Sequence, residues 1–261
     1  MTHYLALYGI LIAVVRPLIV VALLAGLWVA LKRAMLPPRS RVITWLGVAI
    51  PLITWLALIW ISAAAGVFEV GRSQVPLVPL AITLPPVIGL TLLMRSSRIA
   101  AAMDAAPPEW LVSIQVYRVF GANFLVMWAY GAIPGVFALP AGSGDLLVGL
   151  LALPAALYLA SGAAYGRAVA VAWNLLGIAD LVTAVTLGAL SSPGPLQLLS
   201  KVHPNVVAFS YPIVMTPTFA VPLSLILHGL SLRQLWRRQA EARSRNVTLD
   251  RWRAVDGPRD G

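Results

Sequence analysis

Long apolar stretches separated by short polar segments repeat along the whole chain. A membrane-spanning helix needs about 20 mainly apolar residues. Stretches of that length occupy residues 9–31, 42–64, 75–94, 111–137, 146–163, 168–190 and 207–232. The pattern predicts an all-α fold, a polytopic transmembrane helical bundle of about seven spans. No positively charged segment precedes the first stretch and no small-residue cleavage site follows it, so we expect this span to be retained.

Basic residues gather in every second connection between these spans. The connections after the first, third and fifth spans, and the segment after the seventh, contain most of the 19 Lys and Arg residues. The opposite side receives only Arg72 and Lys201. Because Lys and Arg are enriched in cytoplasmic loops, the N-terminus is predicted to lie outside and the C-terminus in the cytoplasm.

A change in composition predicts a single transmembrane helical domain at residues 1–232 and a basic cytoplasmic tail at residues 233–261. At the junction, Ser231–Asn246 is expected to continue the last helix. Val247–Gly261 is expected to be disordered, because it is polar with few apolar residues. Arginine-rich segments beside a membrane bind anionic lipids, so the bilayer and its anionic lipids are the expected partners of the tail. Docking of another protein there is the alternative.

Composition and charge narrow the function classes. The chain has 60% hydrophobic and 11% charged residues, which is unlike a soluble domain. Its formal net charge of +10 does not indicate nucleic-acid binding, because the loops that carry it are too short to form a surface for DNA or RNA. The absence of Cys excludes disulfides, thiolate catalysis and iron–sulfur clusters.

Proline is densest in two of the predicted spans. Pro85 and Pro86 are adjacent in the third, and Pro212, Pro217 and Pro222 lie in or beside the seventh. Each proline removes a helical hydrogen bond. Broken helices form substrate sites at mid-membrane depth in transporters, although proline is also simply more frequent in membrane helices than in soluble ones.

Ionisable and polar side chains inside the spans are the candidate functional residues. Burying them in a membrane is costly, and they usually face a bundle interior or a cavity. Helical rise places Asp180 near mid-membrane, at a depth that either Arg16 or Arg118 could reach. The candidates for a binding or transport site are Arg16, Arg118, Asp145, Asn174, Asp180 and His228.

Each candidate also has a structural interpretation. Arg16 and Arg118 can extend towards opposite membrane surfaces along their flexible stems. Asp145 lies at the outer end of the fifth span, where an acidic side chain caps a helix N-terminus. His228 is expected to be a hydrogen-bonded interior histidine rather than a ligand. Asp180 is too short to reach the surface, so pairing or protonation is expected for it.

No motif for catalysis, a metal or a cofactor occurs in the chain. HExxH, GxSxG and aspartate-rich prenyl-diphosphate motifs are absent. Both Lys residues lie in loops, which excludes a retinal Schiff base, and no two His residues share one depth as haem ligands. We therefore predict no catalytic residues, no metal site and no cofactor, and an enzyme is a less favoured class.

Four motifs lie between about residues 110 and 235. They are Tyr117-Arg118-x-x-Gly121, Pro140-Ala-Gly-Ser-Gly-Asp145, Trp173-Asn174-x-x-Gly177-x-x-Asp180 and Pro193-Gly-Pro195. Through these motifs the chain resembles a family of uncharacterised bacterial multi-pass inner-membrane proteins. The resemblance implies a location in the inner (plasma) membrane of a bacterium, and it implies nothing about mechanism.

Three function classes remain. The first is a small-solute or ion transporter or channel with a polar site at mid-membrane. The second is a non-catalytic membrane subunit or scaffold that assembles with a membrane partner or as a homo-oligomer through small residues at helix contacts. The third is an intramembrane enzyme that modifies a lipid, using Asp145, Asp180 and His228 for acid–base chemistry. The transporter or channel is the favoured hypothesis.

Overall fold

The computed structural model describes residues 2–73 and 75–255, and this part of the chain is helical and contains no β-strand. Apolar composition and few internal breaks make the first helices long. They are α1 (Thr2–Arg33), α2 (Pro38–Ala64) and α3 (Leu77–Arg95), followed by the short α4 (Ser97–Ala105).

The fourth span is a composite of three helical pieces, whereas a continuous helix was expected over residues 111–137. The pieces are α5 (Glu109–Ser113), the 3₁₀ helix η1 (Ile114–Ala122) and α6 (Asn123–Ala129). The chain then turns at Gly131, whose φ of +67° is a left-handed conformation that glycine adopts without strain. Two long helices follow, α7 (Gly135–Ala160) and α8 (Gly166–Ser191).

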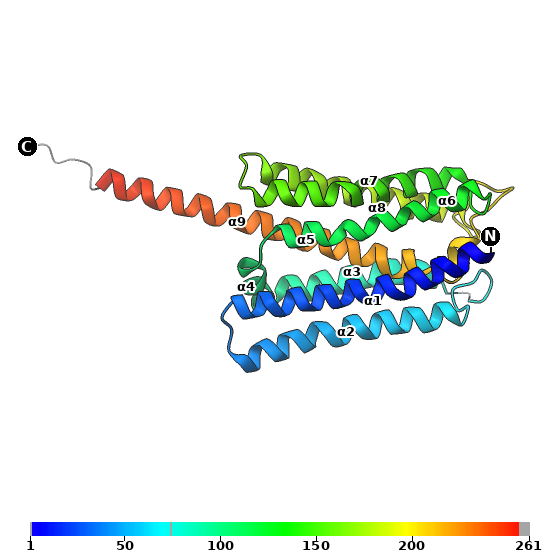
Figure 1. Cartoon of the computed structure of the whole chain (residues 1–261), viewed down its shortest axis with the longest axis horizontal. Helices are drawn as coiled ribbons and strands as arrows, with labels where there is room; N and C mark the ends of the chain where they lie inside the picture. Colours follow the sequence, from blue (N-terminus) through cyan, green and yellow to red (C-terminus); the bar gives the residue numbers. More distant parts are fainter. Residues whose placement is uncertain (1, 74, 256–261) are drawn as a thin grey trace, which may run out of the picture.

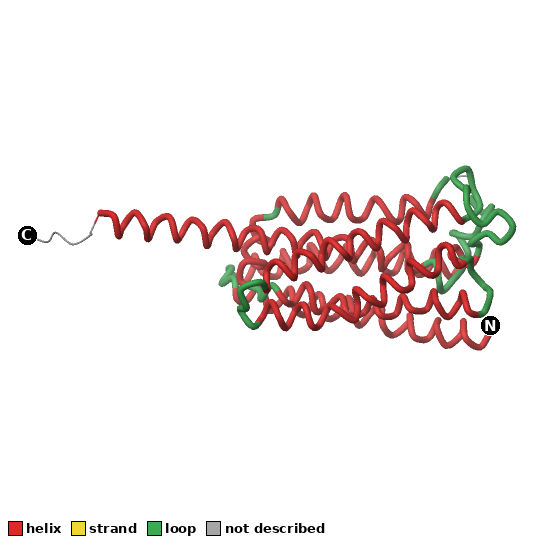
Figure 2. The backbone as a smooth tube through the Cα atoms, turned by 90° about the horizontal axis from the view of Figure 1, so that it is seen from above, coloured by secondary structure: helices red, strands yellow, loops and turns green. Residues whose placement is uncertain are grey.

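The last part of the chain is irregular before it becomes helical. It contains the 3₁₀ turn η2 (Val207–Phe209), a cis peptide between Tyr211 and Pro212, and the π-helical turn η3 (Thr216–Ala220). The helix α9 (Val221–Val255) follows and projects far beyond the other helices (Figures 1 and 2). The proline-rich start of the seventh predicted span is therefore broken, whereas α3 continues through Pro85 and Pro86.

Within the described residues, six helical segments are long and apolar enough to cross a membrane, in agreement with a multi-pass membrane protein. They correspond to the first six predicted spans, at His3–Arg33, Pro38–Ala64, Leu77–Arg95, Glu109–Ala129, Gly135–Ala160 and Gly166–Ser191. The seventh predicted span differs, because its α-helical part begins only at Val221 and reaches the basic tail at Arg233.

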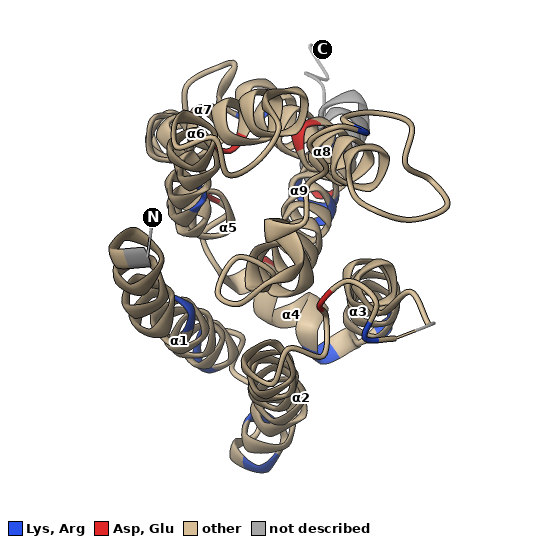
Figure 3. Ribbon diagram, turned by 90° about the vertical axis from the view of Figure 1, so that its right-hand side faces the viewer, with Lys and Arg blue, Asp and Glu red and all other residues tan. Residues whose placement is uncertain are grey.

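The long helices lie side by side along one axis (Figures 1 and 2). Viewed along that axis, α9 lies between α3 on one side and α5 and α8 on the other, with α1 and α2 beside this group (Figure 3). The N-terminus and the projecting part of α9 lie at opposite ends. The α1–α2, α3–α4 and α7–α8 connections share the end from which α9 projects.

Two further predicted boundaries were wrong. The helix α7 begins at Gly135 rather than near residue 146, so Asp145 lies inside a helix and is not its N-cap. Pro140 and the nearby glycines are accommodated because an apolar environment favours backbone groups that bond within the helix. The helix α9 continues to Val255, although disorder was expected from Val247. That stretch contains Leu, Ala and Arg, which are strong helix formers, and it extends a helix already nucleated. The rest of it, residues 256–261, lies outside the described residues.

Small residues bring α7 close to its neighbours. Ala141 and Ala152 are fully buried, and Gly149 packs so closely on the backbone at Val119 of η1 that a Cβ atom would overlap it. Small residues allow this kind of close approach between membrane helices. The indole N–H of Trp173 on α8 also donates to the Val148 carbonyl of α7 at 3.0 Å. Together η1, α7 and α8 form a tight frame for polar side chains.

Candidate functional site

A buried row of residues that includes two polar side chains runs along η1. Gln115, Arg118 and Gly121 are three residues apart, and side chains at that spacing lie above one another in a 3₁₀ helix. All three residues are buried, and Arg118 is only 3% exposed. The 3₁₀ geometry therefore directs the Arg118 guanidinium into the interior rather than towards a membrane surface.

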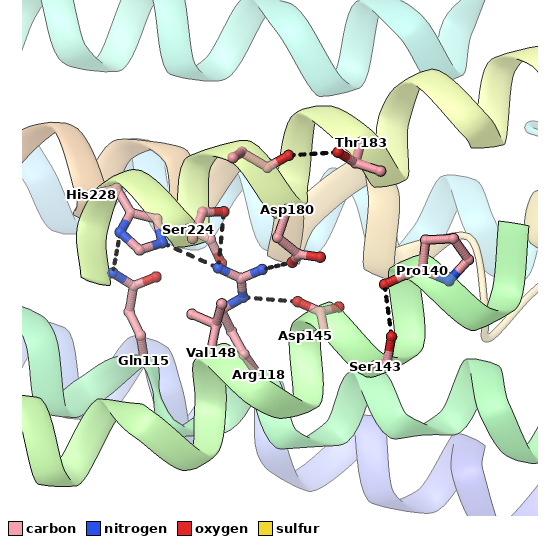
Figure 4. Close-up of polar contacts among 12 residues, drawn as sticks. Gln115, Arg118, Pro140, Ser143, Asp145, Val148, Asp180, Thr183, Ser224 and His228 are labelled. Carbon is pink, nitrogen blue, oxygen red and sulfur yellow. Dashed lines mark hydrogen bonds and ion pairs between the residues drawn. The ribbon is translucent and has the colours of Figure 1, made fainter. Parts of the chain in front are cut away.

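Arg118 joins two carboxylates from adjacent helices (Figure 4). Its Nε donates to Oδ1 of Asp145 on α7 at 2.8 Å, and its Nη2 forms an ion pair with Oδ2 of Asp180 on α8. Its Nη1 donates to the carbonyl oxygen of Gly177 at 3.2 Å. Each guanidinium nitrogen thus has an acceptor. The ion pair between Arg118 and Asp180 is one of the two pairs that helical rise allowed for Asp180.

His228 completes this group from α9. Its Nε2 lies 3.1 Å from Nη1 of Arg118, and its Nδ1 lies 2.9 Å from Oδ1 of Asn174. A guanidinium can only donate, so Nε2 accepts and the ring proton is assigned to Nδ1. The Asn174 amide nitrogen donates to the Ala170 carbonyl at 2.7 Å and to Ser231 Oγ at 3.0 Å. This leaves Oδ1 of Asn174 as the acceptor and holds His228 in one uncharged tautomer.

Gln115 lies beside the same imidazole. Its Nε2 is 3.3 Å from Nδ1 of His228, and within the described residues its Oε1 has no hydrogen-bond partner. The positions of the oxygen and the nitrogen of a side-chain amide are assigned from the hydrogen bonds around them. Exchanging them would let Oε1 face the N–H of His228. In either orientation Gln115 keeps unused hydrogen-bonding capacity beside the cluster.

Three glycines provide the room that these side chains occupy. Each lies on one helix and faces a cluster side chain of another. A Cβ atom added there would overlap that side chain: Gly121 faces Asp145, Gly144 faces Asp180 and Gly177 faces His228. The glycines therefore set how closely η1, α7, α8 and α9 approach one another at the cluster.

Arg16 on α1 lies near the cluster without joining it. Its side chain is only 5% exposed, and its Nη2 donates to Oγ1 of Thr216 in η3 at 3.2 Å. Its Nε has no hydrogen-bond partner in the described part of the chain. Arg16 thus neither extends to a membrane surface nor pairs with Asp180, because its side chain turns inward to Thr216 and Arg118 occupies that carboxylate.

A small cavity of about 20 Å³ separates Arg16 from the Arg118–Asp145 pair. Tyr117 and Ser224 also line it, and their hydroxyl oxygens are 2.7 Å apart. The cavity has room and polar groups for about one water molecule. Arg16, Arg118 and Asp145 line the cavity, and Asp180 pairs with Arg118 beside it, so the formal charges of these four groups balance. Of the two arginines, Arg118 is the one that pairs with both acids.

The structure brings together most of the residues proposed from the sequence. Arg118, Asp145, Asn174, Asp180 and His228 form one hydrogen-bonded cluster, with Arg16 across the cavity. Within residues 2–73 and 75–255, no group of three or more His, Asp or Glu side chains is arranged to hold a metal ion.

Sequence reasoning missed Tyr117, Ser224 and Thr216 as neighbours of these residues. Ser224 could have been found, because it shares the i, i+4, i+7 spacing of one helical face with His228 and Ser231. No comparable signal marks Thr216, which lies in the π-helical turn that precedes this helix.

Residues 75–236 match a family described as a domain of unknown function, DUF8737. The matched range extends from α3 into α9 and includes the whole Arg118 cluster, whereas α1, α2 and therefore Arg16 lie outside it. Comparison with curated proteins and with solved structures gives no match. Because the match covers more than half of the chain, the protein belongs to the DUF8737 family.

Proposed function

We propose that the protein is a transporter or channel that moves protons or small cations across a membrane, with the Arg118 cluster as its site. The observation that supports this is the sharing of one buried guanidinium by two carboxylates, Asp145 and Asp180, from adjacent helices. Ionisable groups inside a membrane bundle are costly, and they commonly mark ion pathways and proton relays.

Protonation would change what holds these helices together. With both carboxylates ionised, Arg118 links η1 to α7 and to α8. A proton on Asp180 would remove the ion pair to α8 and leave the neutral contact with the Gly177 carbonyl. Uptake of a proton and release of a helix contact would therefore favour each other, as coupling between an ion and a conformational change requires.

Polar side chains continue from the cluster towards both ends of the bundle and provide steps for a hydrogen-bonded relay. Towards the end that holds the N-terminus they include Tyr117, Ser224, Arg16, Thr216, Asn123 and Tyr4. Towards the other end they include Asn174, Ser231 and Gln234. Waters can bridge such groups where direct hydrogen bonds are missing.

The proposal includes seven crossings, with the N-terminus outside and the C-terminus in the cytoplasm of a bacterium. The apolar segment of η3 and the first part of α9 would form the seventh crossing. The opposite positions of the N-terminus and the α9 projection support an odd number. The shared end of the basic connections supports the cytoplasmic assignment.

Ion flux in lipid vesicles tests the proposal. Purified protein should speed acidification of vesicles that contain a pH-sensitive dye when a potassium diffusion potential is imposed, compared with protein-free vesicles. Asp180→Asn should remove most of this rate, because an amide cannot take up a proton at this position. Asp104→Asn is the matched control, since it removes a carboxylate that pairs with Arg237 away from the cluster. Absence of any protein-dependent proton, sodium or potassium flux would contradict the proposal.

A structural role for the cluster is the second candidate, and its nearly complete hydrogen bonding favours it. In that case Asp180→Asn should reduce the yield of folded protein rather than the flux for each folded molecule. Gel filtration of the detergent-solubilised variant, measured beside the flux, distinguishes the two candidates.

A further inference from the structure

A large apolar cavity lies on the side of α9 opposite the Arg118 cluster. Its volume is about 850 Å³, which is within the range of small-molecule and cofactor sites. On α9, Leu227 and Leu230 line this cavity, whereas His228 and Ser231 point to the cluster. The two sites therefore use different faces of one helix.

The cavity lies between two parts of the chain. Leu27 on α1 and Pro51 on α2 line one side, outside the range that matches the family. Residues of α3, α4, α5 and α9 line the other. The α3 side chains Leu84, Ile88 and Leu92 line the cavity and are also exposed at the surface of the bundle. The cavity therefore opens sideways, where hydrocarbon chains surround the helices.

Arginines surround the end of the cavity nearest α4. The Arg33 guanidinium lies 4.9 Å from the ring centre of Trp110, which lines the cavity. Arg233 and Arg238 donate to carbonyl oxygens of two other lining residues at 3.4 and 2.6 Å. Among the described residues, none of these three arginines forms an ion pair.

Nearby acids leave this rim positive. Both carboxylate oxygens of Asp104 accept hydrogen bonds from Arg237, at 3.0 and 2.6 Å. These hydrogen bonds raise the pKa of Arg237. Glu109 is the remaining acid on α4 and α5, and Glu241 on α9 lies 4.0 Å from Arg237. Arg33, Arg233 and Arg238 thus outnumber these two glutamates at the mouth of an apolar cavity.

We propose that this cavity binds an anionic phospholipid, with its acyl chains between the α1–α2 pair and the family-matched helices. Its phosphate would be held by Arg33, Arg233 and Arg238. Guanidinium groups form paired hydrogen bonds with phosphate oxygens, and basic pockets between membrane helices bind anionic headgroups. The lipid would connect α1 and α2 to the rest of the bundle. This inference does not depend on ion transport by the Arg118 cluster.

Two sets of variants separate the headgroup from the chains. Replacing Arg33, Arg233 and Arg238 together by Gln removes the phosphate ligands and leaves the cavity open. Gly47 lines the cavity, and a Cβ atom there meets nothing within 4 Å. Gly47→Trp, or the smaller Gly47→Leu, therefore puts an apolar side chain into part of the cavity without touching the rim.

Binding of fluorescent phosphatidylglycerol to the detergent-solubilised protein, with phosphatidylcholine of the same chains for comparison, tests the proposal. The natural sequence should prefer phosphatidylglycerol, and the triple Gln variant should bind it about tenfold more weakly or worse because charge-assisted hydrogen bonds are lost. In a matched control variant, Gln replaces Arg39, Arg95 and Arg243, which lie at the same end of the molecule. This variant should keep the preference for phosphatidylglycerol. The folded Gly47 variants should bind both lipids weakly.

Three results would overturn the proposal. The first is equal binding of the two lipids by the natural sequence. The second is an equal loss in the triple variant and its matched control, which would show an unspecific charge effect. The third is unchanged phosphatidylglycerol binding by a folded Gly47 variant, which would place the chains elsewhere.

Discussion

At the residue scale, Arg118 connects more of the structure than any other candidate predicted from the sequence. Its three nitrogens contact Asp145, Asp180, the Gly177 carbonyl and His228. A buried guanidinium in such a setting is stabilised only while its partners remain, because an isolated buried charge is strongly unfavourable. The cluster therefore behaves as a unit in which each replacement leaves a different charge unpaired.

Replacement of Arg118 should be more harmful than replacement of either acid. Arg118→Gln leaves two carboxylates beside each other, whereas Asp180→Asn leaves Arg118 with Asp145. Breaking a buried pair costs about 3–5 kcal/mol, so we expect a clear loss of folded yield and a lower Tm for Arg118→Gln. Adding Asp145→Asn and Asp180→Asn should recover part of both. Thermal melting followed by gel filtration measures this, and equal melting of the two single variants would argue against a shared guanidinium.

Arg16 should be less critical for folding than Arg118. It has a hydrogen bond to Thr216 and contacts neither acid directly. Arg16→Gln keeps a donor for Thr216 and should lower stability by about 1–2 kcal/mol at most, in the range of one buried hydrogen bond. The same melting assay checks this expectation. A loss as large as that of Arg118→Gln would mean that Arg16 neutralises the acids across the cavity.

At the element scale, unusual helical geometry and glycine positions create the site. The 3₁₀ geometry of η1 aligns Gln115, Arg118 and Gly121, and the uninterrupted α7 carries Asp145 into the bundle. Sequence reasoning placed a helix start near Asp145, because Gly and Pro ordinarily signal a break. Inside an apolar environment the backbone gains more by continuing its internal hydrogen bonds.

Thermal stability should depend on Gly177 more than on Gly188, a second glycine on the same helix. Gly177→Ala would place a methyl group against His228, whereas the Cβ of Gly188→Ala would make an ordinary 3.4 Å contact with Phe137. Overpacking typically costs about 1–3 kcal/mol, so Gly177→Ala should lower the Tm. Gly188→Ala should leave it unchanged or raise it slightly, because Ala favours helix. Similar melting of both variants would contradict the close contact at the cluster.

At the scale of the whole molecule, the proposed orientation rests on the distribution of basic residues between the two ends of the bundle. The basic connections share one end of the bundle, and α9 projects from that same end. The family match adds a division that hydropathy does not show, since α1 and α2 lie outside the matched range while the large apolar cavity lies between them and the matched helices.

Reporter fusions test this orientation. A reporter that is active only outside the cytoplasm should work after Gly131 or Gln197 and should be inactive after Arg98, Gly162 or Arg243. Gly131 suits the purpose because it lies in a turn between two helices, whereas the stretch around Asp145 is helical. Equal activity of fusions at Gln197 and Gly162 would rule out the seven-crossing arrangement.

The sequence by itself determined the helical class, the approximate positions of six apolar segments and the set of buried polar residues that form the cluster. These are local properties, since apolar length and the cost of a buried charge can be judged from neighbours along the chain. The tertiary structure decided the partners. Helical rise gives the depth of a residue, but its direction depends on helix boundaries, on 3₁₀ or π-helical turns, and on how each helix is rotated. For this reason Arg118 pairs with both acids, while Arg16 donates a hydrogen bond to Thr216.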